Sequence, residues 1–142
     1  MVRKILVGAL ASDEGRAAIA AAVAEARATD AEIHLVGFHE HPKGEAKVAT
    51  YAQDTDRLRA HVERIARDLV PEDLRTISHV PEGVGRPSEA ILRVAIQEGV
   101  DLIVIGMRER SRVGKFLMGS NAQDILLGAE CPVLSMKPGQ VI

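Results

Sequence analysis

The chain has few aromatic residues and one cysteine. Its 142 residues include two phenylalanines, one tyrosine and no tryptophan, so we expect an aliphatic core. Proteins that hold single-stranded nucleic acid use aromatic side chains as stacking platforms, and this chain has too few to build one. Cys131 has no second cysteine with which to form an internal disulfide. A domain of this length buries enough surface to fold without a disulfide or a structural metal.

Strong net charge and long apolar runs are also absent. The net charge is −2, which provides no overall basic field for a phosphate backbone, so we expect no nucleic-acid partner. No apolar run approaches the roughly 20 residues that span a bilayer, so we expect no membrane partner. Residues 1–5 carry positive charge but lead into no signal-peptide apolar segment or cleavage site. These observations predict a cytoplasmic protein.

Two apolar periodicities alternate along the chain. Short continuous runs are typical of buried parallel strands, and an alternating run at 74–80 predicts a weaker strand at a sheet edge. Helical spacing separates these runs. The pattern predicts one α/β domain over residues 1–142, with a five-stranded, mostly parallel sheet sandwiched by helices. The expected strands are 4–9, 32–38, 74–80, 101–106 and 132–136, and the expected helices are 17–28, 48–69, 89–97 and 121–127.

In such sheets, ligands bind at the carboxyl ends of strands near the point where strand order reverses. The loops after Ala9, Phe38 and Ile105 should therefore converge. The last of these loops is cationic and leads to a Gly-Ser pair that opens a helix, an arrangement that favours anions. This predicts a nucleotide phosphate site whose candidate residues are Gly106, Arg108, Gly119, Ser120 and Asn121.

Each part of this candidate site has an alternative interpretation. Ser120, with Gln123 three residues later, also fits a capping box at the start of a helix. The cations at Arg108, Arg110, Arg112 and Lys115 also fit a solvated loop. Both interpretations remain open from the sequence, and a helix cap can itself accept an anion.

The sequence shows no arrangement that would carry catalysis. Ser111 and Ser120 lack a nucleophile elbow or a base. Asp13 and Glu14 are better explained as acids that favour the first turn of a helix. Cys131 fits a small hydrophobic residue at a strand start. We therefore do not expect an enzyme.

The histidines do not form an evident metal motif. His39 and His41 flank Glu40, but no third ligand can be placed beside them, so we expect no metal site there. His34 and His79 fall within expected strands. Structural or surface roles account for them.

Five segments in order resemble the universal stress protein family, and the match covers nearly the whole chain. They are residues 5–8, 11–14, 85–91, 101–106 and 131–134. The resemblance implies a Rossmann-like fold related to adenine nucleotide alpha hydrolases, a role in the stress response, and a site for ATP or AMP.

The family's nucleotide signature is incomplete in this chain. Gly106, Gly119 and Ser120 match it with the right spacing, but Glu109 stands where the family has its middle glycine. Leu10 replaces the aspartate with which ATP-binding members hold the adenosine, and Phe38 falls where a small residue packs on the adenine. Glu109 adds a like charge beside a triphosphate, which costs on the order of 1 kcal/mol.

Losing the charged hydrogen bond at Leu10 costs roughly 1.5–3 kcal/mol. Together with the charge at Glu109, this would weaken ATP binding by about two to three orders of magnitude. The resemblance therefore implies a regulatory module with weak or no ATP binding and no firm cofactor. The alternative is a functional ATP- or AMP-binding member whose nucleotide gates a protein partner, with slow hydrolysis. A third reading, an enzyme on the related scaffold, would need a base and a nucleophile that the sequence does not show.

The last expected strand, Val133 to Met136, is apolar and should lie at a sheet edge, where an unprotected strand pairs readily with a second copy. Universal stress proteins commonly dimerise through this strand. We therefore expect a homodimer in which the two final strands run antiparallel. The sequence does not identify any other protein partner.

Overall fold

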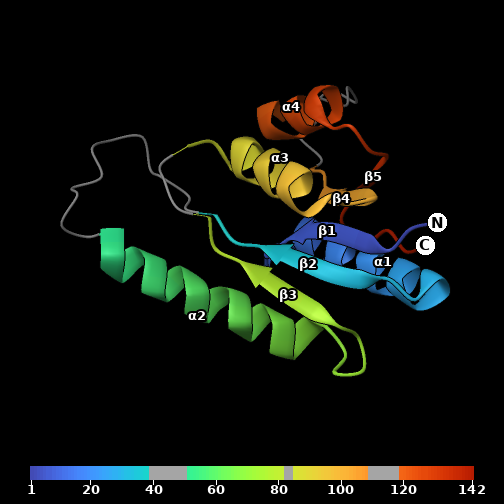
Figure 1. The fold of residues 1–142 in the computed structure, drawn as a ribbon, viewed down its shortest axis with the longest axis horizontal. Coiled ribbons are helices and arrows are strands. Elements are labelled where there is room, and N and C mark those ends of the chain that lie inside the picture. The colour runs from blue at the N-terminus through green and yellow to red at the C-terminus, as the bar shows by residue number, and fades with distance from the viewer. Residues whose placement is uncertain (39–50, 82–84, 109–118) are drawn as a thin grey trace.

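Five strands form the centre of the molecule, and helices cover both faces of their sheet (Figure 1). The computed structural model describes residues 1–38, 51–81, 85–108 and 119–142. The strands are β1 (Lys4–Gly8), β2 (Glu32–Val36), β3 (Thr76–His79), β4 (Leu102–Gly106) and β5 (Val133–Met136). The helices are α1 (Asp13–Thr29), α2 (Tyr51–Leu69), α3 (Pro87–Glu98) and α4 (Ser120–Gly128). The predicted α/β architecture and element order are confirmed.

The strand order is β3-β2-β1-β4-β5, and each of these neighbouring pairs is parallel. Strands β2 and β3 are added on one side of β1, and β4 and β5 on the other, so the strand order reverses between β1 and β4. Doubly wound folds bind ligands at such a point. The expected edge positions of β3 and β5 are confirmed. One aliphatic core lies between the sheet and helices α1 and α2, and a second lies between the sheet and helices α3 and α4.

Local sequence signals account for the ends of α1 and α3. The Ser12 side chain accepts a hydrogen bond from the Gly15 backbone N–H at 3.2 Å and so caps α1. Asp13 and Glu14 stand in the first turn of that helix, as expected, where negative charge interacts favourably with the helix dipole and stabilises the helix. Helix α3 ends at Gly99 in the left-handed conformation, with φ 62°.

Helix α4 corrects the predicted capping box. Its N-cap is Gly119, and Ser120 is already the first helical residue. The Gln123 backbone N–H donates to the Gly119 carbonyl at 3.0 Å, and Gly119 has no side chain with which to cap the helix. A capping box requires serine at the N-cap, and a glycine occupies that position one residue earlier.

The remaining helix predictions agree with the structure as far as it describes them. Val48, the expected start of the second helix, lies outside the described residues, and α2 runs from Tyr51 to Leu69. None of the helices within the described ranges combines the length and hydrophobicity needed to cross a bilayer.

Candidate functional site

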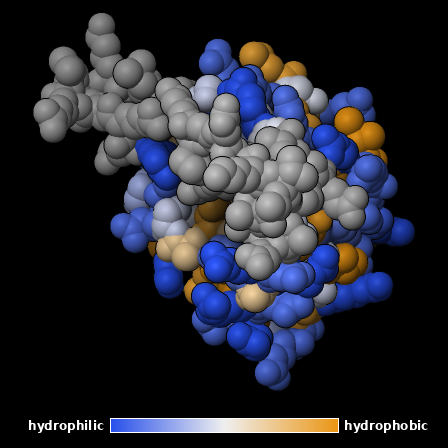
Figure 2. All heavy atoms as spheres, turned by 90° about the vertical axis from the view of Figure 1, so that its left-hand side faces the viewer, coloured by the Kyte–Doolittle hydropathy of each residue, from blue (hydrophilic) through white to orange (hydrophobic). Residues whose placement is uncertain are grey.

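The carboxyl ends of β1, β2 and β4 meet the start of α4 around a cavity of about 260 Å³. Leu10, Phe38, Arg108 and Gly119 contribute to its lining from four different segments. The predicted convergence is therefore confirmed for the three strand ends, while the loop after Phe38 lies outside the described residues. Figure 2 looks onto this end of the molecule and shows apolar atoms recessed next to hydrophilic side chains.

Leu10 and Phe38 make the β1 side of this cavity apolar. A Cβ atom built on Gly8 would lie 3.4 Å from a ring carbon of Phe38 and 4.0 Å from a methyl carbon of Leu10. Both side chains are half-buried and line the cavity. Neither offers a hydrogen-bond acceptor, so this part of the cavity suits an apolar surface better than a ribose hydroxyl.

Gly106 is required by the packing of α1 against β4. A Cβ atom at this position would lie 2.5 Å from the backbone carbonyl oxygen of Glu14. That distance is far inside van der Waals contact, and the obstacle is main chain rather than a movable side chain. The first glycine of the predicted signature therefore has a structural reason to be glycine whether or not a ligand binds.

The first cation after β4 is already paired. Arg108 Nε donates to Glu14 Oε1 at 2.9 Å, with the arginine 63% exposed and the glutamate 13% exposed. Partial burial pushes the pKa of the Glu14 carboxyl up. Hydrogen bonds from its own backbone N–H, Arg108 and Ser12 outweigh that effect and hold the pKa below its usual value. Glu14 is therefore a carboxylate at neutral pH and offsets the charge of Arg108.

Other members of the predicted phosphate loop lie outside the described residues. These are Glu109, Arg110, Ser111, Arg112 and Lys115. The repulsion expected from Glu109 stays a prediction.

The start of α4 faces the cavity without a side-chain cap. Gly119 and Ser120 both line the cavity, and a Cβ atom built on Gly119 would meet open space. The first backbone N–H groups of a helix have no partner within the helix, and here the N-cap glycine has no side chain to cap them. Such a terminus is a ready position for an anion.

Asn121 has a structural partner. Its Oδ1 accepts a hydrogen bond from the backbone N–H of Ser88 at 3.3 Å, in the first turn of α3. The Ser88 hydroxyl, which is almost fully buried, donates to Asp124 Oδ2 at 3.2 Å, and Arg86 pairs with the same Asp124 oxygen at 2.9 Å. Asn121 thus joins the starts of α3 and α4.

The sequence analysis did not predict this hydrogen-bond network. The local sequence gives little sign of it, because the N-cap of α3 is Arg86, whose side chain makes no capping hydrogen bond. A helix with an uncapped start needs an acceptor from elsewhere. Nothing in the sequence shows that the acceptor stands 33 residues later, at Asn121.

Cys131 and His61 are not part of the cavity lining. Cys131 is half-buried, and burial raises the pKa of its thiol, which disfavours the reactive thiolate. His61 Nε2 lies 3.2 Å from the Ala9 carbonyl oxygen and donates to it. His39 and His41 lie outside the described residues. A partner for β5 stays a prediction.

Comparisons with known proteins agree on one family. The model of the universal stress protein family matches residues 1–137. A universal stress protein of Thermus aquaticus is 34% identical over 144 residues, covering 96% of this chain and 100% of that protein.

Solved structures agree as well. A universal stress protein from Archaeoglobus fulgidus superposes with a TM-score of 0.76 at 27% identity, covering 96% of this chain and 100% of that one. A universal stress protein from the same organism in complex with dAMP gives a TM-score of 0.64 at 25% identity, again covering 96% and 100%.

Proposed function

Since the chain belongs to the universal stress protein family, we propose that it is a regulatory stress-response protein with a weakened adenine nucleotide site. It acts through contacts with other proteins rather than by turnover. The site is the cavity between β1, β4 and α4. The observation that carries the proposal is the apolar side chain of Leu10 in its lining.

Leu10 weakens the site because it leaves a buried polar group of the ligand without a partner. A nucleoside that entered the cavity would lose water from the polar groups facing Leu10 and Phe38, and neither side chain could replace the lost hydrogen bonds. An unpaired buried hydroxyl costs roughly 1–3 kcal/mol, and replacing water by a leucine methyl group returns none of it. The affinity for an adenine nucleoside falls accordingly.

The Arg108–Glu14 ion pair reduces the attraction for phosphate. An incoming anion meets a guanidinium that already has a carboxylate 2.9 Å away. To gain the full attraction of Arg108, the anion must displace Glu14 or accept its repulsion. This effect grows with the number of phosphates, so it disfavours ATP more than AMP.

The side chains around the cavity support a role without turnover. Within the described part of the lining, the groups that could transfer a proton or attack are Glu14 and the Ser120 hydroxyl. Glu14 is held by Arg108. A nucleophilic serine needs a base within hydrogen-bond reach, and this lining supplies none for Ser120.

Dimerisation through β5 belongs to the same proposal. β5 is an edge strand of four residues whose described neighbour in the sheet is β4. A second copy can extend the sheet across this edge by backbone hydrogen bonds. A two-fold dimer would then present two copies of the cavity to a protein partner.

Isothermal titration of the protein with ATP and with AMP tests the proposal. We expect no saturable binding of ATP at micromolar concentration by the natural chain. Leu10→Asp should strengthen binding about ten-fold or more, because a carboxylate gains a charged hydrogen bond of roughly 1.5–3 kcal/mol. Leu10→Asn is the matched control, since asparagine has nearly the same shape as aspartate but carries no charge. Micromolar affinity for ATP in the natural chain would overturn the proposal.

A second candidate is a nucleoside monophosphate sensor. The start of α4 at Gly119 favours it, because its first backbone N–H groups face the cavity and suit a single phosphate. The dAMP complex of the Archaeoglobus fulgidus relative supports the same reading. Tighter binding of AMP than of both adenosine and ATP would favour this candidate over the first.

A further inference from the structure

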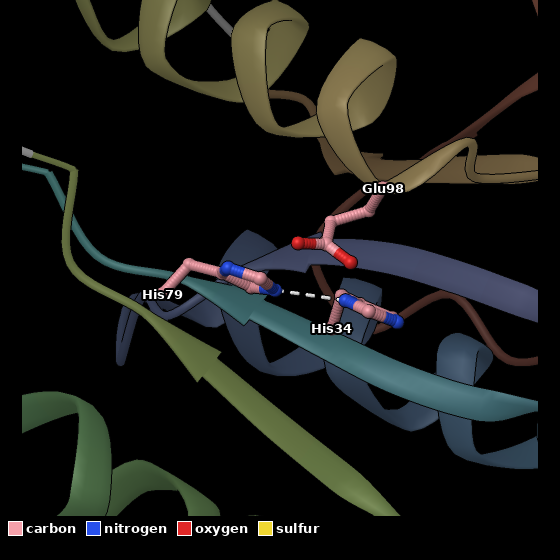
Figure 3. A group of neighbouring side chains, drawn as sticks. All are labelled: His34, His79 and Glu98. Carbon is pink, nitrogen blue, oxygen red and sulfur yellow. Dashed lines mark hydrogen bonds between the residues drawn. The ribbon is translucent and has the colours of Figure 1, made fainter.

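Two histidines and a glutamate meet at a place separate from the cavity lining. His34 lies in β2, His79 at the end of β3 and Glu98 at the end of α3. Figure 3 shows the two rings edge to edge, with the carboxylate of Glu98 pointing from α3 toward the space between them. The three ligand atoms, one from each residue, all lie within 4.8 Å of one another.

Strand register places the two histidines on one face of the sheet. His34 pairs with Ile77, and Val36 pairs with His79. Side chains two residues apart on a strand share a face, so His34 and His79 point the same way. Val36 belongs to the core under α3, which identifies that face as the one beneath Glu98.

The cluster combines a buried end with an open end. His34 is fully buried, whereas His79 and Glu98 are half-buried. An ion could therefore reach the cluster past His79 and Glu98 and end against a rigidly held ring. His34 stands in a central strand, so its position is set by the sheet.

Hydrogen bonds settle the tautomer of His34. Its Nε2 lies 2.9 Å from Glu32 Oε1, and a carboxylate can only accept, so Nε2 carries the proton. In the neutral ring, Nδ1 then has a lone pair, and this atom lies 2.8 Å from His79 Nε2. The ring nitrogens of the two imidazoles thus face each other.

We propose that His34, His79 and Glu98 bind one divalent transition-metal ion of the zinc class, with Glu32 as the outer carboxylate that orients His34. Two imidazole nitrogens and one carboxylate oxygen are a common protein ligand set for such ions, with further positions left for water. A metal-bound histidine usually donates its other N–H to a carboxylate, and Glu32 already accepts that hydrogen bond.

Binding requires a small movement of His79. At a metal–nitrogen distance of about 2.0–2.1 Å, two nitrogens in a tetrahedral site stand about 3.3 Å apart. They are now 2.8 Å apart, so the rings must separate by about 0.5 Å. His79 lies in an edge strand and is half-buried, which leaves it room to move. His79 Nε2 must also give up the proton that it now donates to His34 Nδ1. The His79 ring takes up a proton at Nδ1 instead, and the lone pair of Nε2 then faces the ion.

The charges around the cluster favour an ion that prefers nitrogen ligands. Lys4 Nζ donates to the Glu98 carbonyl oxygen at 2.8 Å, and Arg75 Nε lies 3.5 Å from Glu32 Oε2. Arg75 pairs with the Glu32 carboxylate, and Lys4 adds a second positive charge at the end of α3. The two positive charges match the two carboxylates in number, so the surroundings of the site have little net charge with which to attract Mg²⁺ or Ca²⁺. Zn²⁺ and Co²⁺ gain from the imidazoles and should be selected.

Titration of the metal-free protein with Zn²⁺ tests the proposal. The protein used carries His39→Asn and His41→Asn, because these two histidines could otherwise bind metal on their own. We expect one equivalent of Zn²⁺ to bind and Mg²⁺ not to compete. Glu98→Gln should weaken binding at least ten-fold, and Glu32→Gln about 10- to 100-fold. His61→Asn and Glu89→Gln are matched controls outside the cluster and should leave the affinity unchanged.

A measurement that needs no variant keeps the test independent of folding. Imidazole nitrogen resonances of His34 and His79 should shift together on addition of one equivalent of Zn²⁺, and Co²⁺ should give the visible absorption of a bound ion. Equal affinity in Glu98→Gln and Glu89→Gln, loss of binding in the His39/His41 background, or unshifted His34 resonances would overturn the proposal. The nucleotide titrations do not involve these residues, so the two proposals can fail separately.

Discussion

Arg108 Nε lies 2.9 Å from Glu14 Oε1, so residues 94 positions apart join the end of β4 to the first turn of α1. The same two segments touch at Gly106, which has no room for a side chain against the Glu14 carbonyl. One edge of the candidate nucleotide site is therefore a rigid contact between a helix and a strand. Its cation, Arg108, already has a carboxylate of the protein as partner.

Glu14→Gln should strengthen the binding of AMP and ATP. The substitution frees Arg108 from a partly exposed ion pair that is worth roughly 0.5–1 kcal/mol, which corresponds to a gain of about two- to five-fold. Isothermal titration measures the change. Asp13→Asn removes the neighbouring acid of the same helical turn, and an equal gain in that variant would show a general charge effect instead.

Gly106→Ala should destabilise the protein by about 1–3 kcal/mol, because a methyl group cannot fit 2.5 Å from the Glu14 carbonyl oxygen without moving α1. Urea unfolding measures the free energy. Gly119→Ala is the matched control, since that position faces open space with an ordinary φ of −63°. Similar stabilities for the two variants would contradict the packing argument.

Asn121→Ala should lower stability by about 1 kcal/mol, because the Ser88 N–H loses its acceptor at the start of α3. Asn121→Asp keeps an acceptor and should restore most of the loss. Thermal unfolding measures both variants, alongside AMP titration. An alanine variant with unchanged stability and lost AMP binding would instead make Asn121 a ligand residue.

Asp101 should make stability depend on pH in the acid range. Its Oδ2 accepts the backbone N–H groups of Arg3 at 2.8 Å and Lys4 at 3.0 Å, tying the start of β4 to β1. These hydrogen bonds outweigh burial and hold the pKa of Asp101 below its ordinary value of 3.8. A lowered pKa means that this stabilisation is full above that value. It is lost as pH falls through the folded-state pKa.

The variant Asp101→Asn tests that pH dependence. We expect it to be less stable than the natural chain by about 1 kcal/mol at pH 7. The difference should shrink as the pH falls below 3.8 and through the lower folded-state pKa, where the natural carboxyl also becomes neutral. Thermal unfolding at pH 7 and in strong acid measures it. A difference that does not change with pH would contradict the role given to the carboxylate.

Ser135→Pro should convert the proposed dimer to a monomer without unfolding it. The Ile103 N–H donates to the Pro132 carbonyl and the Met107 N–H to the Met136 carbonyl. Backbone groups alternate in direction along a strand. The N–H of Ser135 therefore points to the open edge of β5, where proline removes it and spares the β4 ladder. Ser135→Thr keeps the N–H and is the control. Light scattering measures the mass, and a monomeric natural chain would contradict the proposal.

Prediction from sequence worked where the signal is local. The runs that became β1 and β4 are apolar on both faces. Helices α1 and α3 begin and end within a few residues of where periodicity and capping place them. The error at α4 is also local. Gly119 and Ser120 both suit an N-cap, and only the backbone conformation distinguishes them.

By itself, the sequence determined the order of strands and helices, the aliphatic core and the convergence of three strand ends at the reversal of strand order, because hydrophobic periodicity and crossover handedness act along the chain. Only the tertiary structure decided which polar groups meet. Arg108 pairs with Glu14, and Asn121 accepts a hydrogen bond from Ser88. His34 lies beside His79 and near Glu98. Strand register and helix placement set those pairs, and both depend on contacts between residues far apart in the chain.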